Sequence, residues 1–227
     1  MKTIGIVACS AEGAALCYRT ICTEGPAMFG PHAHPPVVMH TPPLSDYVAC
    51  IERDDWLGVG RLMLASAGVL AGAGADFLIC PDNTIHQALP QIRPRSPRPW
   101  LHIAEAVADA AAAAGHRRIG LTGTQWLVES DVYPDALRAR GLTCIRPPAA
   151  VRAEMNRRIM DELVYGVFKP ETADFFQDVI RELADAGADA AVLGCTEIPR
   201  VVPDGSAAIP TFDSTRLLAR AALQEAA

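Results

Sequence analysis

The stretch AGAGADFLICPDNTIH, residues 71–86, holds the pattern that decides the fold. Small residues and glycines lead through Asp76 into an apolar run that ends at Ile79, which is typical of a helix end followed by a buried strand. The polar residues beginning at Asp82 then stand where this strand reaches the edge of its sheet. Because parallel α/β sheets bind ligands at the carboxyl ends of their strands, this turn is a candidate functional site.

The pattern occurs a second time in the chain. Residues 184–192, ADAGADAAV, match residues 71–79, and residues 118–123, RIGLTG, match the apolar opening at 4–8 with nearly the same offset. The repeat predicts an α/β protein with two similar Rossmann- or flavodoxin-like lobes, each with a parallel sheet, related by a pseudo-two-fold axis. The alternative is that any α/β protein contains several units of this kind.

A proline-rich segment, residues 89–100, separates the two copies and is expected to form neither a helix nor a central strand. We expect the chain to cross there to the second lobe and to return through an amphipathic segment at 216–226. The predicted domains are therefore 1–98 plus 211–227 for the first lobe and 99–210 for the second. The active site is expected in the cleft between them.

Composition narrows the class of protein. Half of the 227 residues are apolar and the net charge is −6 without long charged runs, which argues against a nucleic-acid surface. No apolar run approaches the roughly 20 residues of a membrane span, and the N-terminus is typical of a first strand more than of a signal peptide. Seven cysteines without CxxC spacing indicate reduced thiols. We therefore expect a cytoplasmic protein.

Acid–base chemistry is the feature that the two strand-end turns share. When the copies are aligned, Asp82 falls opposite Cys195, and each is followed by small hydrogen-bonding side chains. Two proton-transfer groups on opposite sides of one molecule can remove a proton from a stereocentre and return one to the other face. The alternatives are that Asp82 only caps a helix and that Cys195 is a buried core thiol.

These motifs resemble those of the aspartate/glutamate racemase family. Its first motif usually reads Cys-Asn-Thr-x-His, which residues 82–86, DNTIH, resemble, and its second motif, Gly-Cys-Thr-Glu, matches residues 194–197. The segment 165–170, YGVFKP, is similar to the family segment whose basic residue holds a substrate carboxylate. The resemblance implies two α/β lobes, no pyridoxal phosphate or other cofactor, no metal, and a homodimer.

The resemblance also implies an amino-acid racemase or epimerase of the aspartate/glutamate type, acting on a small carboxylate substrate. Asp82 and Cys195 are the expected catalytic pair. The expected substrate-binding residues are Ser10, Asn83, Thr84, Thr124, Lys169 and Thr196. Lys169 alternatively is an ordinary solvated lysine.

Histidines near the motifs have two interpretations each. His86 is expected to share a helix face with Asp82 and to orient it, and a plain surface histidine is the alternative. The trio His32, His34 and His40 has metal-ligand residue types but lacks acidic or thiol partners in sequence.

Two departures from the family pattern bear on the reaction. A carboxylate at position 82 is a weaker base than a thiol, with reference pKa values of ~3.9 and ~8.5. The family's usual arginine near Tyr47, which grips a second substrate carboxylate, is absent. A decarboxylase, a cis–trans isomerase or a hydantoin racemase on the same fold therefore stays open, as does a ligand-binding protein that has lost catalysis.

Overall fold

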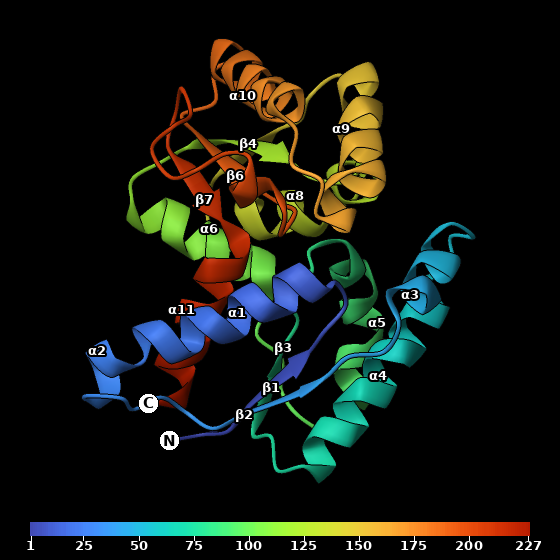
Figure 1. Cartoon of the computed structure of the whole chain (residues 1–227), viewed down its shortest axis with the longest axis vertical. Coiled ribbons are helices and arrows are strands. Elements are labelled where there is room, and N and C mark those ends of the chain that lie inside the picture. The colour runs from blue at the N-terminus through green and yellow to red at the C-terminus, as the bar shows by residue number, and fades with distance from the viewer. The chain divides into compact units, whose positions relative to one another are not determined.

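The computed structural model describes all 227 residues, and the chain forms two compact units (Figure 1). Unit 1 comprises residues 1–103 and 215–227, and unit 2 comprises residues 104–214. The chain therefore passes between units somewhat later than the expected points at 98/99 and 210/211. The later return to unit 1 is explained by strand β7 (Thr211–Asp213), which pairs with β6 (Ala190–Leu193) and so keeps these residues in unit 2.

Unit 1 is built on a three-stranded parallel sheet with the order β2-β1-β3. The central strand β1 (Ile4–Val7) pairs with β2 (Val37–His40) on one side and with β3 (Phe77–Ile79) on the other. Both β1 and β3 are buried along their whole length. This burial explains their continuous apolar sequence, since strands covered on both faces have no polar alternation.

Helices from both ends of the chain cover the unit 1 sheet. Helix α1 (Ala11–Glu24) and the C-terminal helix α11 (Ser214–Ala226) share one apolar core with β1 and β3. Helix α4 (Trp56–Gly72) packs against β1 and β2. The shorter helices of this unit are α2 (Pro26–Phe29), α3 (Leu44–Ile51) and α5 (Leu89–Ile92), with 3₁₀ turns at Thr84–Ala88 and Arg93–Arg95.

Unit 2 has a four-stranded parallel sheet with the order β5-β4-β6-β7, in which β4 spans Arg118–Thr122 and β5 spans Thr143–Ile145. Helix α10 (Pro170–Asp185) buries Phe176, Val179, Ile180 and Leu183, the spacing of one helix face, against β4 and β6. The other helices are α6 (Ile103–Ala113), α7 (Gln125–Glu129), α8 (Val132–Arg138) and α9 (Ala149–Asp161), with 3₁₀ turns at Leu163–Tyr165 and Ile198–Arg200. No helix of the protein is both long and apolar enough to span a membrane.

The repeated sequence pattern performs the same structural task in both units. Asp76 Oδ2 accepts the main-chain N–H of Thr3 at 2.7 Å, just before β1, and Asp189 Oδ2 accepts that of Arg117 at 2.8 Å, just before β4. The preceding glycines, Gly74 and Gly187, have φ angles of 93° and 92°, a left-handed conformation that ends a helix. In both sheets the first strand of the unit is central. The predicted α/β class with two similar lobes is thus confirmed.

The proline-rich segment differs from the prediction, because it contains helix α5 and a 3₁₀ turn. Pro90 and Pro94 lie in the first turn of these two elements. At this position the missing N–H of proline removes no internal hydrogen bond. The expectation that proline excludes any helix here was wrong, since each element is too short to extend beyond its first turn.

Candidate active site

In unit 1, four predicted site residues lie on two neighbouring turns at the carboxyl edge of the sheet. Ser10 follows β1, and Asp82, Asn83 and Thr84 follow β3, which is adjacent to β1. Ser10 is the N-cap of α1, where its Oγ accepts the N–H of Gly13 at 3.2 Å. The Asp82 side chain is half-buried, whereas Ser10, Asn83 and Thr84 are buried. These four predicted residues therefore lie at the same edge of the unit 1 sheet.

Asp82 is held in its turn by two hydrogen bonds. Its Oδ1 accepts the N–H of Ile85 at 3.2 Å, so the carboxylate caps the 3₁₀ turn that follows. Its main-chain carbonyl lies 2.6 Å from Nδ1 of His86. Asp82 thus has the capping role that was the alternative interpretation, and its side chain is partly exposed.

His86 is a buried structural histidine and not a surface one. Nε2 of His86 accepts the N–H of Ile103 at 3.3 Å, which requires the ring proton on Nδ1, and Nδ1 donates to the carbonyl of Asp82. Burial lowers the pKa of His86 to about 4, so the ring is neutral. His86 therefore orients the turn through the main chain of Asp82 and not through its carboxylate.

In unit 2, three further predicted residues lie on the turns after β4 and β6. Thr124 follows β4 and caps α7, with Oγ1 accepting the N–H of Leu127 at 3.2 Å. Cys195 and Thr196 follow β6, the strand next to β4. Gly194 joins the two turns, because its N–H binds the carbonyl of Thr122 at 3.1 Å and a Cβ at this position would clash with that carbonyl oxygen. Only glycine fits directly before Cys195.

The thiol of Cys195 has a carboxylate partner in the same turn. Its Sγ donates a hydrogen bond to Oε2 of Glu197 at 2.9 Å. Glu197 is 2% exposed, whereas Cys195 is half-buried. A buried carboxylate beside a thiol can accept its proton and so create the thiolate, which is the reactive form of cysteine. The sequence showed Glu197 in the Gly-Cys-Thr-Glu motif, but residue order alone did not assign it this contact.

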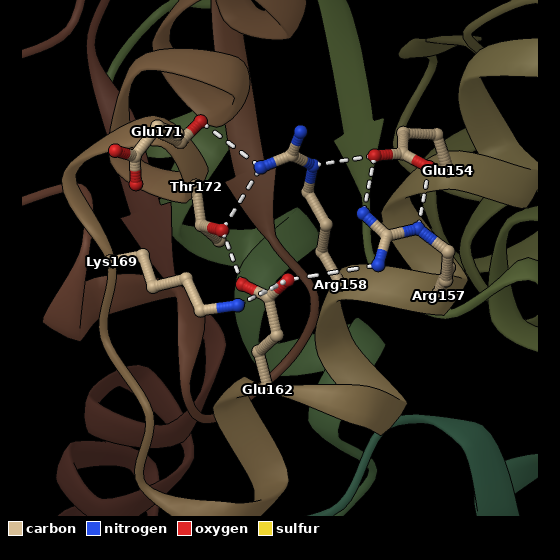
Figure 2. Close-up of polar contacts among 7 residues, drawn as sticks. All are labelled: Glu154, Arg157, Arg158, Glu162, Lys169, Glu171 and Thr172. Carbon is tan, nitrogen blue, oxygen red and sulfur yellow. Dashed lines mark hydrogen bonds and ion pairs between the residues drawn. The ribbon is translucent and has the colours of Figure 1, made fainter.

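Lys169 lies apart from the strand-end turns, on the segment between α9 and α10. It is the N-cap residue of α10, and its Nζ is 3.3 Å from Oε1 of Glu162 (Figure 2). Its side chain is 52% exposed. The structure therefore gives this lysine a specific ionic partner that the sequence interpretation did not include.

No group of three or more His, Cys, Asp and Glu side chains in the chain is arranged to hold a metal ion, and all seven cysteines are free thiols. Among the histidines noted in the sequence, His40 places Nδ1 3.0 Å from Oγ of Ser66.

The sequence pattern shared by Asp/Glu/hydantoin racemases matches residues 5–222 of this chain. The protein belongs to the Asp/Glu/hydantoin racemase family. The match covers both sheets except Ile4, the first residue of β1, and it includes both strand-end turns. The predicted family is therefore confirmed.

Individual members of the family show how far the similarity extends. The broad specificity amino-acid racemase RacX of Bacillus subtilis is 23% identical over 164 residues, 70% of this chain and 69% of RacX. A glutamate racemase of Deinococcus radiodurans is 32% identical over 136 residues, 57% of this chain and only 44% of that enzyme. A crystal structure of a candidate Asp/Glu racemase from Yersinia pestis superposes with a TM-score of 0.89 at 30% identity, covering 100% of this chain and 99% of that one.

Proposed function

We propose that this family member is a cofactor-independent racemase or epimerase that acts at the α-carbon of an amino acid. The observation that carries the proposal is the 2.9 Å hydrogen bond between Sγ of Cys195 and Oε2 of Glu197. It supplies a thiol at a strand end with a built-in proton acceptor. Family membership and the name of RacX support the same reaction class.

In the proposed reaction, Glu197 accepts the thiol proton and the Cys195 thiolate removes the α-proton of the substrate. The electron pair of the C–H bond passes into the substrate carboxylate as an enolate-like charge. Asp82, in its protonated form, returns a proton to the opposite face of the α-carbon. In the reverse direction Asp82 is the base, and because a carboxylate is a weaker base than a thiolate this direction has the harder proton abstraction.

The carboxylate of the substrate is proposed to bind the hydrogen-bonding side chains at the strand ends and the charge of Lys169. These side chains are Ser10, Asn83, Thr84, Thr124 and Thr196. Donors aimed at the carboxylate stabilise the charge that develops on it during proton removal. The breadth of substrates in the name of RacX argues for testing neutral as well as acidic amino acids.

Deuterium exchange at the α-carbon tests the reaction directly. The L and D forms of aspartate, glutamate and alanine are incubated with enzyme in D₂O, and loss of the Cα proton is followed by NMR. Wild type is expected to exchange at least one pair of enantiomers, and Cys195→Ala to exchange none. Absence of exchange with every amino acid would reject the proposal.

Asp82→Asn is the informative second variant. An asparagine side chain retains an oxygen that can cap Ile85, so the turn is expected to persist, but it can neither give nor take a proton. We expect racemisation to fall by about 10²- to 10⁴-fold, the usual contribution of a general acid or base. Exchange of one enantiomer through Cys195 is expected to survive.

A one-face reaction is the second candidate function. It is favoured by the unit 2 turn, in which the Cys195 thiol is paired with the carboxylate of Glu197. Decarboxylation of a substituted malonate needs a proton donor on one face only, which Cys195 alone can provide. Release of carbon dioxide from substituted malonates by both wild type and Asp82→Asn would support it.

A further inference from the structure

Lysine is rare in this protein, and one of its lysines lies in a charged cluster. The chain contains 18 arginines but only two lysines, Lys2 and Lys169. Lys2 pairs with Glu225 near the chain ends. Lys169 instead contacts Glu162, a carboxylate that is only 6% exposed. An ammonium group is compact and sits on a flexible stem, so its position depends on what holds it.

The carboxylate of Glu162 binds three different side chains, as Figure 2 shows. Oε2 accepts the hydroxyl hydrogen bond of Thr172 at 2.5 Å, and Oε1 lies 3.3 Å from Nζ of Lys169 and 3.6 Å from Nη1 of Arg157. The Thr172 hydroxyl, together with Lys169 and Arg157, holds the pKa of Glu162 below its usual range. Glu162 is therefore a fixed negative charge at neutral pH.

The main chain of Glu162 holds the loop that leads to Lys169. Its carbonyl accepts the N–H of Tyr165 at 3.1 Å and that of Val167 at 3.0 Å. The side chains of Tyr165 and Val167 are nevertheless exposed, at 77% and 41%. The loop is thus held at its start by the carbonyl of Glu162 and at its end by the carboxylate of the same residue.

The loop also contacts the segment that follows the Cys195 turn. The guanidinium of Arg200 lies 5.1 Å from the ring centre of Phe168, the residue directly before Lys169. The N–H of Arg200 in turn binds the carbonyl of Glu197 at 3.0 Å. Within unit 2, Phe168, the neighbour of Lys169, is therefore linked through Arg200 to Glu197, the partner of the Cys195 thiol.

We propose that Glu162 is a positioning residue, which orders the Lys169 ammonium for binding the carboxylate of the substrate. The inference rests on the proposed function. Ordering a lysine before the substrate binds removes part of the entropy cost of binding. About half of the Lys169 side chain is exposed, so the ammonium group that Glu162 orders stays accessible to the substrate.

The arginines of the cluster are held mainly by Glu154. Both arginines bind Glu154 at 2.7 to 2.8 Å, and Arg157 also lies 3.6 Å from Glu162. The ionic partner of Lys169 is Glu162. Because an ammonium group has three N–H donors, Lys169 can bind a substrate carboxylate without displacing Glu162.

Glu162→Gln is the central test. Glutamine is of the same size and keeps an oxygen for the Thr172 hydroxyl, but it loses the charge that holds Lys169. We expect KM for the best amino-acid substrate to rise about three- to tenfold and kcat to stay within about twofold, since ordering one flexible side chain is worth roughly this much in binding. Glu154→Gln is the matched control, because Glu154 belongs to the same cluster without contacting Lys169, and KM is expected to stay unchanged.

A double-mutant cycle separates positioning from a general structural effect. In the Lys169→Met background, Glu162→Gln is expected to leave KM unchanged, because the group that it positions is gone. An additional rise in KM in that background, equal to the rise in wild type, would overturn the proposal. An unchanged KM for Glu162→Gln alone would overturn it as well.

The small number of lysines provides a measurement independent of activity. Protein labelled with ¹⁵N-lysine should show two side-chain ammonium signals at low temperature and mildly acidic pH, and Lys2→Arg identifies the one from Lys169. We expect this signal to differ from that of free lysine in wild type and Glu154→Gln, and to move to the free-lysine position in Glu162→Gln. If wild type racemises an amino acid but its Lys169 signal is that of free lysine, the positioning role of Glu162 is rejected and the proposed function stands. If the Lys169 signal is ordered but no amino acid is turned over, the proposed function is rejected and the ordering of Lys169 stands.

Discussion

The thiol of Cys195 donates its hydrogen bond to Glu197, with 2.9 Å between Sγ and Oε2. A negative charge this close opposes a second negative charge on sulfur and favours the protonated thiol. In the proposed reaction, Cys195 therefore becomes a base when its proton moves to Glu197. The proposed proton-transfer unit of this turn is the pair of residues and not the thiol by itself.

Glu197→Gln is predicted to make Cys195 more reactive but less useful for racemisation. Without the neighbouring charge the thiolate forms more easily, so iodoacetamide, which reacts with thiolates, should alkylate Cys195 about three- to tenfold faster at neutral pH. Racemisation should fall because the proton acceptor is lost. Mass spectrometry of the Cys195 peptide measures the alkylation. The half-buried thiols of Cys22 and Cys50 are internal controls that should not change, and slower alkylation of Cys195 would contradict the prediction.

The buried neutral histidine of the Asp82 turn predicts how stability depends on pH. The pKa of His86 is about 4 in the folded protein and about 6.5 when unfolded, so between these values the unfolded state binds more protons. The free energy of unfolding should therefore be highest above pH 6.5 and fall as the pH is lowered towards 4. The full contribution is roughly 3 kcal/mol.

Urea unfolding at a series of pH values between 7 and 4 checks the effect of His86. His86→Gln can keep hydrogen bonds to Asp82 and Ile103 but does not titrate, so its stability should change less over this range. His32→Gln replaces an exposed histidine and should retain the slope of wild type. Equal slopes in His86→Gln and wild type would rule out His86 as the cause.

The duplicated aspartates predict a pair of unequal stability losses. Asp189 accepts the N–H groups of Arg117 and Arg118, at 2.8 and 3.2 Å, whereas Asp76 accepts only that of Thr3. Asp189→Ala should cost about 2 kcal/mol and Asp76→Ala about 1 kcal/mol, at about 1 kcal/mol for each hydrogen bond. Midpoints of urea unfolding measure both. A larger loss for Asp76→Ala would contradict this assignment.

The strand ends were predictable from sequence because they depend on local patterns. A buried strand shows an unbroken apolar run, and a helix often ends at a glycine in the left-handed conformation. Residues 71–79 and 184–192 combine both signals and therefore predict where two strands begin and end. Asp82 and Cys195 then follow from their distance along the chain. The aspartate of each repeat, Asp76 or Asp189, could be aligned before its hydrogen bonds were known.

Contacts set by tertiary packing could not be predicted in this way. The tautomer of His86 depends on the N–H of Ile103, which lies in a different element. The ionic partner of Lys169, Glu162, is the residue that ends α9, and the contact forms because the chain turns back after this residue. The prediction that residues 89–100 contain no helix was wrong for a related reason. The energetic cost of proline depends on its position in a helix, and residues 89–95 form helices of a single turn.

Two buried tyrosines, one in each unit, predict opposite effects of losing a hydroxyl group. Tyr47 and Tyr133 are both fully buried, and burial raises the pKa of each. The hydroxyl of Tyr133 shares a hydrogen bond with Ser214. The hydroxyl of Tyr47 is buried without a hydrogen bond of ordinary geometry, and Oγ of Ser66, which binds Nδ1 of His40, lies close enough to lower the pKa of Tyr47.

Replacing each tyrosine with phenylalanine removes one oxygen atom and little else. Tyr133→Phe should lower the free energy of unfolding by about 1 kcal/mol, the usual value of one hydrogen bond. Tyr47→Phe should leave it unchanged or raise it by up to about 1 kcal/mol, because a buried polar group without a partner is itself unfavourable. Urea unfolding of both variants at neutral pH measures the difference. Equal destabilisation by the two substitutions would show that the Tyr47 hydroxyl has a partner in solution, and a buried water molecule would then be the first candidate because such waters bind polar groups of this kind.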